Sequence, residues 1–412
     1  MAEAIALEQT DPYSVELDEI DVSRPELMQT DTHWGYFERL RKEDPVHFCT
    51  DSMFGPYWSI TKFDHIMDME KNHQDFSSDA GIILADRPED FSTPNFIGMD
   101  PPKHDVQRKT VQGVVAPINL AKLERTIRQR AATILDSVPI GETFNWVDLV
   151  SIELTTQMLA TIFDFPFEDR RKLTYWSDMA TSGELAGGPT PEAERRAALL
   201  ECLEVFTELR KRRGNEPQKP DLLSMLAHGK DTQNMPAMEF LGNLILLIVG
   251  GNDTTRNSIS GGVHFLNQNP EQYAKLRADH SLIPNMVSEI IRYQTPLAYM
   301  RRTATRDVDF HGKTIRAGDK IAMWYVSGNR DEEAIESPNE FRIDRERARH
   351  HLSFGFGVHR CMGNRLAEMQ LRILWEEIMA RFECVEQVGP VERVQSSFVR
   401  GYAELPVVLH PR

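Results

Sequence analysis

The chain has 412 residues, with 47 basic and 63 acidic side chains and a formal net charge of −16. Its content of 41% hydrophobic and 27% charged residues is typical of a soluble globular protein. The acidic balance argues against binding to nucleic acid or to an anionic membrane surface, because both carry negative charge. The four cysteines, at positions 49, 202, 361 and 384, are too few and too scattered for a disulfide scaffold or a paired-cysteine zinc site, and they favour a reducing compartment.

The N-terminal segment is strongly acidic. Residues 1–30 contain eight Asp or Glu residues and a single basic residue, Arg24, which is the opposite of a signal peptide. We therefore expect an acidic tail over residues 1–30, followed by one catalytic domain over residues 31–412. No apolar run approaches the roughly 20 residues that span a bilayer, so we expect no membrane anchor and a cytoplasmic location.

The hydrophobic periodicity predicts a mainly helical protein with small β-sheets, an α+β class. A helix over 32–43 ends before Pro45, and short strands follow at 46–49 and 57–60. Residues 77–99 have no clear period, and we expect a functional loop there. From about 103 to 282 the pattern is almost entirely helical. After a helix that ends near Tyr293 we expect strands up to Trp324, a helix that begins near Cys361, and strand-like alternation over 398–409.

Residues 354–363, with the sequence FGFGVHRCMG, form the most informative stretch of the chain. Three glycines allow a tight backbone that a flat ligand can approach closely. A helix that begins near Cys361 would point its N-terminal dipole at the sulfur and favour the thiolate. A thiolate beside His359 and Arg360 is a suitable ligand for a soft or intermediate metal, including haem iron.

Three other interpretations of Cys361 compete with a haem ligand. It could be a buried structural cysteine, which is the commoner role of a single cysteine. It could be a nucleophile activated by His359, although residues two apart rarely meet as base and nucleophile. It could bind zinc together with His350, His351 and His359, although the spacing does not match paired ligands. The local chemistry alone does not decide between a structural cysteine and a metal ligand.

The loop resembles a known family. Phe354, Gly357, His359, Cys361 and Gly363 match the haem-binding loop of the cytochrome P-450 superfamily at every fixed position. The resemblance implies the cytochrome P-450 fold, a single triangular-prism unit with haem b between a long central helix and the cysteine loop. It also implies that Cys361 is the axial iron ligand and that His359 contacts a haem propionate.

A second motif is the Glu-x-x-Arg of Glu289 and Arg292. The spacing alone is uninformative, because several surface pairs in this chain share it. Its place on an apolar helix resembles the family's buried pair, which a second arginine joins to brace the haem loop. Where the family usually has that arginine, this chain has Glu340, so we predict Arg345 as the third member and Arg342 as the alternative.

Basic side chains in two further segments are candidate propionate contacts. His104 and Arg108 lie four apart on one face of a helix that begins after Asp100-Pro101-Pro102, and two basic groups aimed at one point suit an anionic ligand. The alternative is a solvated basic face. The resemblance implies that both residues contact haem propionates and that Arg302, next to Arg301, supplies a further contact.

Residues 250–255, with the sequence GGNDTT, interrupt an apolar helix expected from about 236 to 267. These residues weaken a helix. A structural explanation remains open, in which threonines bond back to the preceding turn and Asp253 pairs with Arg256. The resemblance implies an oxygen-binding groove: Gly250 and Gly251 leave room for dioxygen, Thr254 hydrogen-bonds the oxygen, and Asp253 relays protons through water.

The resemblance implies a bacterial-type monooxygenase that inserts one oxygen atom of O2 into a C–H bond. The chain contains no nucleotide-binding fingerprint between a strand and a helix, so we expect its electrons to come from a ferredoxin and a ferredoxin reductase. Because ferredoxins are acidic, docking requires a local basic patch, for which the candidates are Arg108, Lys109, Arg360 and Arg365.

The predicted substrate is small and apolar. By position in the family pattern, the pocket residues are Ile82, Ile83, Leu84, Leu246, Val249, Leu297, Phe398 and Val399, although some of them could belong to the core. Residues 241–262 resemble the bacterial terminal alkane hydroxylases, which predicts ω-hydroxylation of medium-chain alkanes or similar chains. The alternatives are a cytochrome P-450 that acts on terpenes, fatty acids or N-heterocycles, and a haem protein that binds a gas or transfers electrons without oxygenation.

Overall fold

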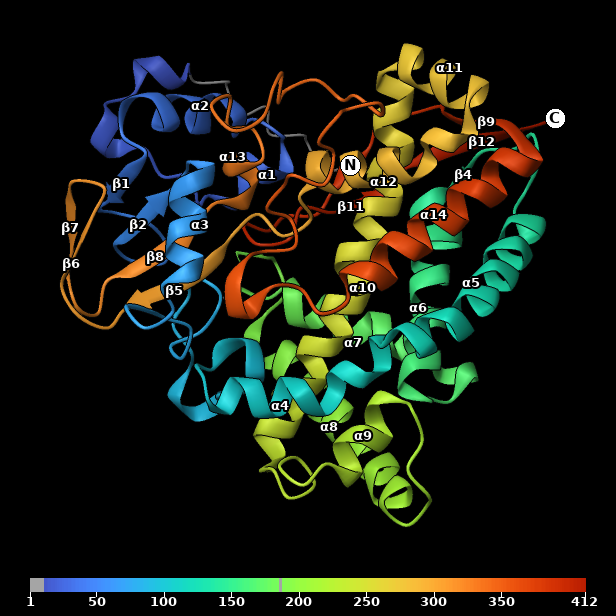
Figure 1. The fold of residues 1–412 in the computed structure, drawn as a ribbon, viewed down its shortest axis with the longest axis horizontal. Helices are drawn as coiled ribbons and strands as arrows, with labels where there is room; N and C mark the ends of the chain where they lie inside the picture. Colours follow the sequence, from blue (N-terminus) through green and yellow to red (C-terminus); the bar gives the residue numbers. More distant parts are fainter. Residues whose placement is uncertain (1–10, 185–186) are drawn as a thin grey trace.

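A computed structural model describes residues 11–184 and 187–412 of the chain. The architecture is mainly helical with small sheets, as the sequence predicts. In Figure 1 the molecule is broad where the largest sheet and helices α11–α14 lie, and it narrows towards helices α8 and α9. The helix α10 runs through the middle of both parts and connects them.

The helix α10 (Ala237–Gln268) organises the core because it is apolar on most of its surface. It packs against α6 (Glu153–Phe163), α7 (Arg171–Thr181), α12 (Ile283–Gln294) and α14 (Asn364–Arg381). A glycine at position 242 is needed for this packing: a Cβ atom there would lie 2.1 Å from the carbonyl oxygen of Pro94. The irregular segment before α4 therefore lies directly against α10.

The largest sheet has five strands in the order β1-β2-β8-β5-β3. Its strands are β1 (Val46–Cys49), β2 (Tyr57–Ile60), β3 (Phe76–Ser77), β5 (Met300–Ala304) and β8 (Lys320–Met323). Strand β8 runs parallel to β2 and antiparallel to β5, with Arg302 opposite Ile321. Because side chains alternate along a strand, this register directs Arg301 and Arg302 to opposite faces of β5.

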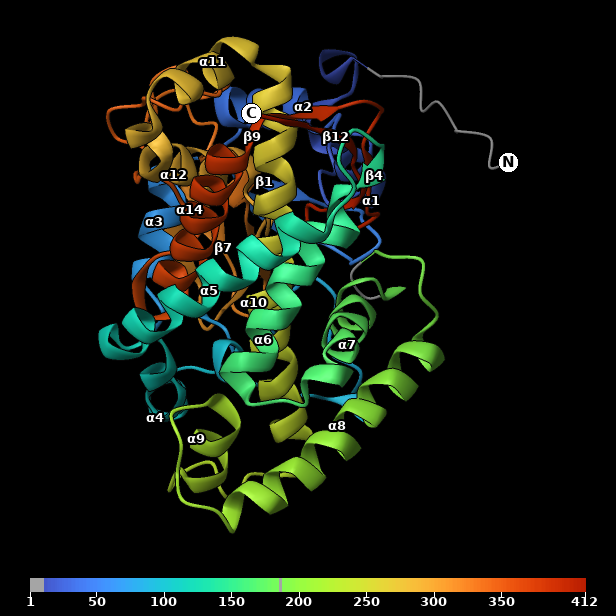
Figure 2. The same cartoon turned by 90° about the vertical axis from the view of Figure 1, so that its right-hand side faces the viewer.

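The remaining elements complete the two parts of the molecule. The other helices are α1 (Pro25–Gln29), α2 (Trp34–Glu43), α3 (Phe63–Lys71), α4 (Lys103–Val111), α5 (Pro117–Ser137), α8 (Glu192–Gly214), α9 (Leu222–His228), α11 (Pro270–Ala278) and α13 (Tyr325–Gly328). The other strands are β4 (Phe144–Asn145), β6 (Val308–Phe310), β7 (Lys313–Ile315), β9 (Phe382–Gln387), β10 (Glu392–Arg393), β11 (Tyr402–Glu404) and β12 (Pro406–Pro411). Helix α14 lies alongside α5 in both views of the ribbon (Figure 1, Figure 2).

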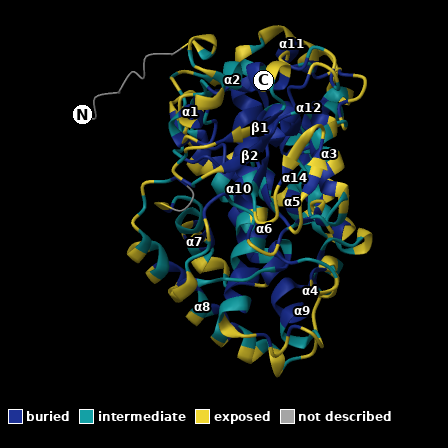
Figure 3. Cartoon of the chain, turned by 90° about the vertical axis from the view of Figure 1, so that its left-hand side faces the viewer, coloured by how far each residue is buried: buried dark blue, intermediate teal, exposed yellow. Residues whose placement is uncertain are grey.

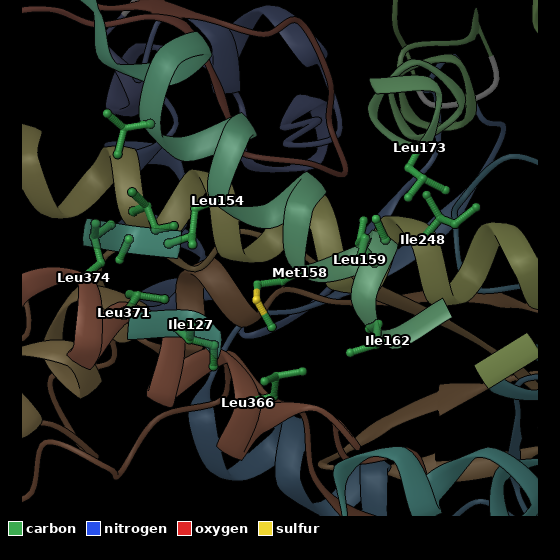
Figure 4. Packing of buried hydrophobic residues seen from close by; sticks show 14 of the residues in the cluster. Ile127, Leu154, Met158, Leu159, Ile162, Leu173, Ile248, Leu366, Leu371 and Leu374 are labelled. Carbon is green, nitrogen blue, oxygen red and sulfur yellow. The ribbon is translucent and has the colours of Figure 1, made fainter. Parts of the chain in front are cut away.

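The burial pattern follows from this layout. Figure 3 shows buried residues in the interior around α10, α12 and β2, and exposed residues on the outer turns of α8. Figure 4 shows the main apolar cluster, in which Met158, Leu159 and Ile162 of α6 lie between Ile248 of α10 and Leu366 of α14. This cluster continues into the lining of a cavity beside Cys361.

Two predicted boundaries differ from the structure. Helix α14 begins at Asn364 rather than near Cys361, because Gly357–His359 form a 3₁₀ turn and Cys361 lies in the loop between the two. In the segment expected to be an acidic tail, Ile20, Val22 and Met28 are buried against the sheet region, while residues 1–10 lie outside the described part of the chain. The strands at 46–49 and 57–60 are confirmed as β1 and β2.

Within residues 11–184 and 187–412, no helix is long and apolar enough to cross a membrane.

Candidate active site

A cavity of about 340 Å³ lies between α10 and the cysteine loop. Helix α10 contributes Gly250, Gly251 and Thr254 to its lining, and the loop contributes Phe354 and Cys361. Further lining comes from the irregular segment 77–99, from α6, from β5 and from the turn at Phe398. Segments far apart in sequence thus enclose one space beside the cysteine.

The cysteine loop is held by backbone contacts that only glycine permits. Gly357 has a φ of +66°, and a Cβ atom there would lie 2.3 Å from the carbonyl oxygen of Glu70 at the end of α3. The backbone N–H of Cys361 donates to the carbonyl oxygen of Phe354 at 2.8 Å, which closes the loop. The glycines therefore let the loop lie against α3 and leave Cys361 directed to the cavity.

The environment of Cys361 suits a metal ligand. Cys361 is accessible to solvent-sized molecules and lines the cavity. Burial raises the pKa of its thiol, whereas the backbone N–H groups of Gly363 and Asn364 lower it by donating to the sulfur. The effect of burial is the larger, so the pKa lies above its ordinary value. The sequence suggested that the helix dipole would favour the thiolate, but the dipole does not produce it alone. Binding to a metal deprotonates a thiol outright.

The competing interpretations of Cys361 gain no support. Among the described residues, no three His, Cys, Asp or Glu side chains come together as a metal site, so zinc has no ligand set. The His359 ring is hydrogen-bonded to Ser78 at 3.1 Å and contacts the ring of His104. A purely structural cysteine would be packed, as Cys202 is, rather than open to a cavity.

Four basic side chains predicted as propionate contacts gather at one end of the cavity. Arg108, Arg302 and His359 line it, and His104 packs edge-on against His359 with ring centroids 4.4 Å apart. In the described structure, Nε2 of His104 and Nδ1 of His359 are buried without a hydrogen-bond partner. Such groups are costly unless a ligand satisfies them, and carboxylate oxygens between two guanidinium groups would do so. The residues present therefore fit the propionate groups of haem.

The choice between Arg301 and Arg302 follows from the strand. The Arg301 guanidinium donates to the carbonyl oxygens of residues 83–85 and to Asp86, away from the cavity. The Arg302 guanidinium lines the cavity and donates to Glu70 at 2.7 Å. Burial lowers the pKa of His359 to about 2, with Arg302 as the next contribution, so this imidazole is neutral and can donate a hydrogen bond.

The groove in α10 is open at Gly250 and closed at Gly251. A Cβ atom at Gly250 would meet no heavy atom within 4 Å, whereas one at Gly251 would lie 2.7 Å from Leu159. The Thr254 hydroxyl donates to the carbonyl oxygen of Gly250 at 2.9 Å and lines the cavity. Gly250 and Thr254 therefore both face the space above the cysteine.

Asp253 is paired with Arg256, as the structural explanation of residues 250–255 allowed. Its carboxylate is fully buried, forms an ion pair with Arg256 at 2.9 Å and is absent from the cavity lining. Arg256 also pairs with Asp178 of α7 at 2.6 Å. Burial raises the pKa of Asp253 although Arg256 lowers it. The link to the cavity is Thr181, which lines it and donates to Asp253 at 3.2 Å, a contact that sequence spacing cannot indicate.

The buried brace has the predicted composition. Glu289 and Arg292 are both 0% exposed and pair at 2.8 Å, and Arg345 binds the same carboxylate at 3.0 Å. Arg342 contributes only its backbone N–H to Glu289, and its side chain faces Glu336 at 3.6 Å. Ser353 donates to the carbonyl oxygen of Ile291 at 2.8 Å, which joins α12 to the segment before the cysteine.

The predicted substrate residues divide into two groups. Most of them line the cavity: Ile82, Ile83, Leu246, Val249, Leu297 and Phe398. Leu84 and Val399 instead lie in the second apolar core. The backbone N–H of Leu84 donates to the Tyr299 hydroxyl, and Val399 forms a β-bridge with Leu297. They form a layer behind the lining. Sequence reasoning missed further apolar lining residues on α6, the 96–97 turn and β5: Phe96, Ile97, Met158, Leu159, Ile162 and Met300.

Comparisons with known proteins agree with this geometry. The family model described as Cytochrome P450 matches residues 192–402. Linalool 8-monooxygenase of Pseudomonas putida is 33% identical over 409 residues, which cover 95% of this chain and 99% of that protein. Cytochrome P450-153 from Novosphingobium aromaticivorans is 46% identical, with a TM-score of 0.89 and coverage of 95% of this chain and 99% of that structure. CYP153D17 from Sphingomonas sp. PAMC 26605 is 49% identical, with a TM-score of 0.90 and coverage of 96% and 100%. The chain therefore belongs to the cytochrome P450 family of monooxygenases, whose members bind haem b through a cysteine thiolate.

Proposed function

We propose that this cytochrome P450 hydroxylates the terminal carbon of medium-chain alkanes or similar aliphatic chains, with electrons from a ferredoxin. The observation that carries the proposal is the apolar lining of the cavity beside Cys361. The sequence of residues 241–262, which resembles that of terminal alkane hydroxylases, supports it. Two solved structures of P450-153 proteins match the chain at 46% and 49% identity.

The lining accounts for substrate binding. Leu246 and Val249 of α10 face the same space as Ile82 and Leu297, so an alkyl chain is surrounded by aliphatic side chains. Binding then rests on buried apolar area, at about 25 cal/mol per Å². Few polar groups line this part of the cavity, and the substrate therefore needs no charged anchor.

Haem held by Cys361 supplies the oxygen chemistry: one atom of O2 enters a C–H bond and the other leaves as water. Cys361 would hold the haem iron, and His104, Arg108, Arg302 and His359 would bind its propionates. Thr254 presents a hydroxyl beside Gly250. Its O–H now donates to a backbone carbonyl, and rotation about one bond would redirect it towards the cavity.

Proton supply to this hydroxyl begins at Asp253. The carboxylate contacts Thr181, which shares the cavity with Thr254. On the other side, Arg256 connects Asp253 with the partly exposed Asp178. We infer that Asp253 delivers protons to the cavity along the Thr181 side, through water, rather than by facing the oxygen directly.

Electron supply requires a docking face near Cys361. Lys109, Arg360 and Arg365 are exposed, and none of them has an ion-pair partner among the described residues. Arg108 is half-buried and donates to the carbonyl oxygen of Arg360, which ties α4 to the cysteine loop. Unpaired cations in a chain of net charge −16 suit an acidic partner such as a ferredoxin.

The second candidate substrate class is an acyclic terpene. It is favoured by the 33% identity to linalool 8-monooxygenase over nearly the whole of both chains. An apolar cavity alone would accept either class, because buried area does not discriminate between them.

The test is product analysis with purified holoenzyme, a ferredoxin and its reductase. Linear alkanes, linear fatty acids and linalool are first screened by the spin-state change that a substrate causes in the haem spectrum. The proposal predicts a change with linear alkanes and a primary alcohol as the main product. Oxidation of internal carbons only, or a response to linalool without any response to alkanes, would overturn it.

A further inference from the structure

Glu70 is a buried carboxylate beside the haem-propionate cluster that no motif of the sequence indicates. It lies in the last turn of α3, and its side chain is 1% exposed. Its Oε2 accepts from the Arg302 guanidinium at 2.7 Å, and its Oε1 accepts from the Tyr325 hydroxyl. Arg302 and Tyr325 both line the cavity.

The backbone around Glu70 fixes its position relative to the cysteine loop. A Cβ atom at Gly355 would lie 3.4 Å from Oε1 of Glu70, and one at Gly357 would lie 2.3 Å from its carbonyl oxygen. The loop that carries Cys361 is therefore packed against this residue. A movement of Glu70 would be transmitted to Arg302 and to the loop.

The carboxylate of Glu70 helps to orient the Arg302 guanidinium. A guanidinium has five N–H donors. In Arg302, Nη1 donates to the carbonyl oxygen of Arg301 at 2.9 Å and Nη2 donates to Glu70. These contacts orient the planar group from behind and leave other N–H bonds for an anion in the cavity.

The negative charge of Glu70 offsets the positive charge of Arg302. Arg302 pairs with Glu70 within the described structure, and both side chains are at most 3% exposed. Water therefore screens the pair weakly, so the carboxylate offsets most of the arginine charge near the cavity. Arg108 of α4 is the other guanidinium that lines the cavity, and it has no ion-pair partner among the described residues.

We propose that Glu70 is a positioning residue that orients Arg302 towards a haem propionate and, by its negative charge, holds the reduction potential of the haem down. Reduction adds an electron, which a nearby negative charge opposes and a positive charge favours. The inference rests on the proposed role of Arg302 as a propionate contact. It is independent of which substrate the enzyme oxidises.

The experiment measures the haem midpoint potential of the purified holoenzyme by spectroelectrochemical titration. Glu70→Gln keeps the size and hydrogen-bonding capacity of the side chain and removes its charge, so the potential should become more positive. Asp68→Asn is the matched control: it removes the same charge from the same helix, but Asp68 is 50% exposed and screened by water. Its potential should equal that of the unmodified protein.

A second variant keeps the test decisive if Glu70→Gln does not take up haem. Tyr325→Phe removes the hydroxyl that donates to Glu70, so the carboxylate presents more negative charge and the potential should become more negative. A purely packing role of Glu70 moves neither potential. Unchanged potentials in Glu70→Gln and Tyr325→Phe, or a Glu70→Gln shift no larger than that of Asp68→Asn, would overturn the inference.

Arg302→Gln separates the inference from the role on which it rests. Loss of this positive charge should make the potential more negative. If Arg302→Gln shifts the potential and Glu70→Gln does not, Arg302 contacts the propionate and Glu70 is not its positioning residue. If neither variant shifts it, the role of Arg302 fails as well.

Discussion

We propose that the coupling of oxygen consumption to product formation depends on Thr254. Its hydroxyl is placed beside Gly250 by the helix itself, since Thr Oγ1 bonds back to the carbonyl four residues earlier. Asp253, its neighbour in sequence, points to α7 and not to the cavity. The two residues therefore act from different sides of the same helix.

We predict that Thr254→Ala uncouples the enzyme. Oxygen and reducing equivalents continue to be consumed, while product formation falls by up to roughly 10²-fold, because positioned proton transfer contributes this much. The ratio of product to oxygen consumed measures the effect. Thr254→Ser retains the hydroxyl and should restore much of the coupling; equal coupling in the Ala variant and the unmodified enzyme would exclude this role.

Residue-level prediction from the sequence succeeded where the chemistry is local. The fixed positions around Cys361 and the Glu289–Arg292 spacing lie within one turn or one loop, so their geometry follows from the backbone. The sequence left the Asp253–Arg256 pair as an alternative, did not tell which pocket residues belong to the core, and gave no sign of the contact of Glu70 with Arg302. Those depend on which distant segment packs against each side chain, and spacing carries no information about that.

At the scale of elements, the brace joins α12 to the segment that precedes the cysteine loop. Glu289 accepts from Arg292 and Arg345 and from the backbone of residue 342, so both oxygens are used. Arg292 also donates to the carbonyl oxygens of Asn329 and Pro338. We predicted Arg345 by comparison with the family pattern. Its contact with Glu289 depends on how the chain runs between the two residues, which the sequence does not show.

We predict that Glu289→Gln destabilises the protein by about 3–5 kcal/mol, because it leaves two buried guanidinium groups without their carboxylate. Denaturant unfolding of the holoenzyme measures this free energy. Glu346→Gln removes an exposed carboxylate and should change it by less than about 0.5 kcal/mol. A Glu289→Gln value as small as that of the control would contradict the brace.

The pH dependence of the brace has a definite sign. Burial raises the pKa of Glu289, but the hydrogen bond and charge of Arg292 outweigh it, so the pKa lies below its ordinary value. The contribution is therefore complete above the ordinary carboxyl pKa of about 4.3 and is lost as pH falls through the lowered value. In Glu289→Gln, unfolding free energy should fall less steeply with acidification than in the unmodified protein.

Gly250 and Gly251 of α10 provide a matched pair of substitutions. Gly250→Ala adds a methyl group in open space, so stability should rise by about 0.5–1 kcal/mol while the cavity narrows and substrate binding weakens. Gly251→Ala adds it 2.7 Å from Leu159, so stability should not rise. Thermal unfolding and substrate titration measure both effects; equal behaviour of the two variants would show that the groove is not open at Gly250.

For the whole molecule, the net charge of −16 hides an uneven distribution. Helix α5, which packs against α14, carries the exposed residues Lys122 and Arg125, for which the described structure shows no ion pair. Net charge is read directly from composition, whereas the position of unpaired charges depends on which elements pack together. The fold class was predictable because helical periodicity covers most of the chain; the cavity walls were not, since they join segments from residue 82 to residue 398.

We predict that Lys109→Glu combined with Arg365→Glu slows reduction by ferredoxin by roughly tenfold or more at low salt, and less at high salt, since the attraction is screened. Stopped-flow reduction measures the rate. Arg24→Glu combined with Arg316→Glu reverses the same charge on two exposed residues, one just before α1 and one between β7 and β8. Equal slowing in both double variants would place the docking face elsewhere.

The central claim is that haem in this cavity is held by the thiolate of Cys361. The most direct measurement is the absorption spectrum of the reduced, CO-treated holoprotein, compared with that of Cys361→His. The account predicts the red-shifted band of thiolate-bound haem in the unmodified protein and its loss in Cys361→His. Absence of the band from the unmodified protein, or its persistence in the variant, would contradict the account.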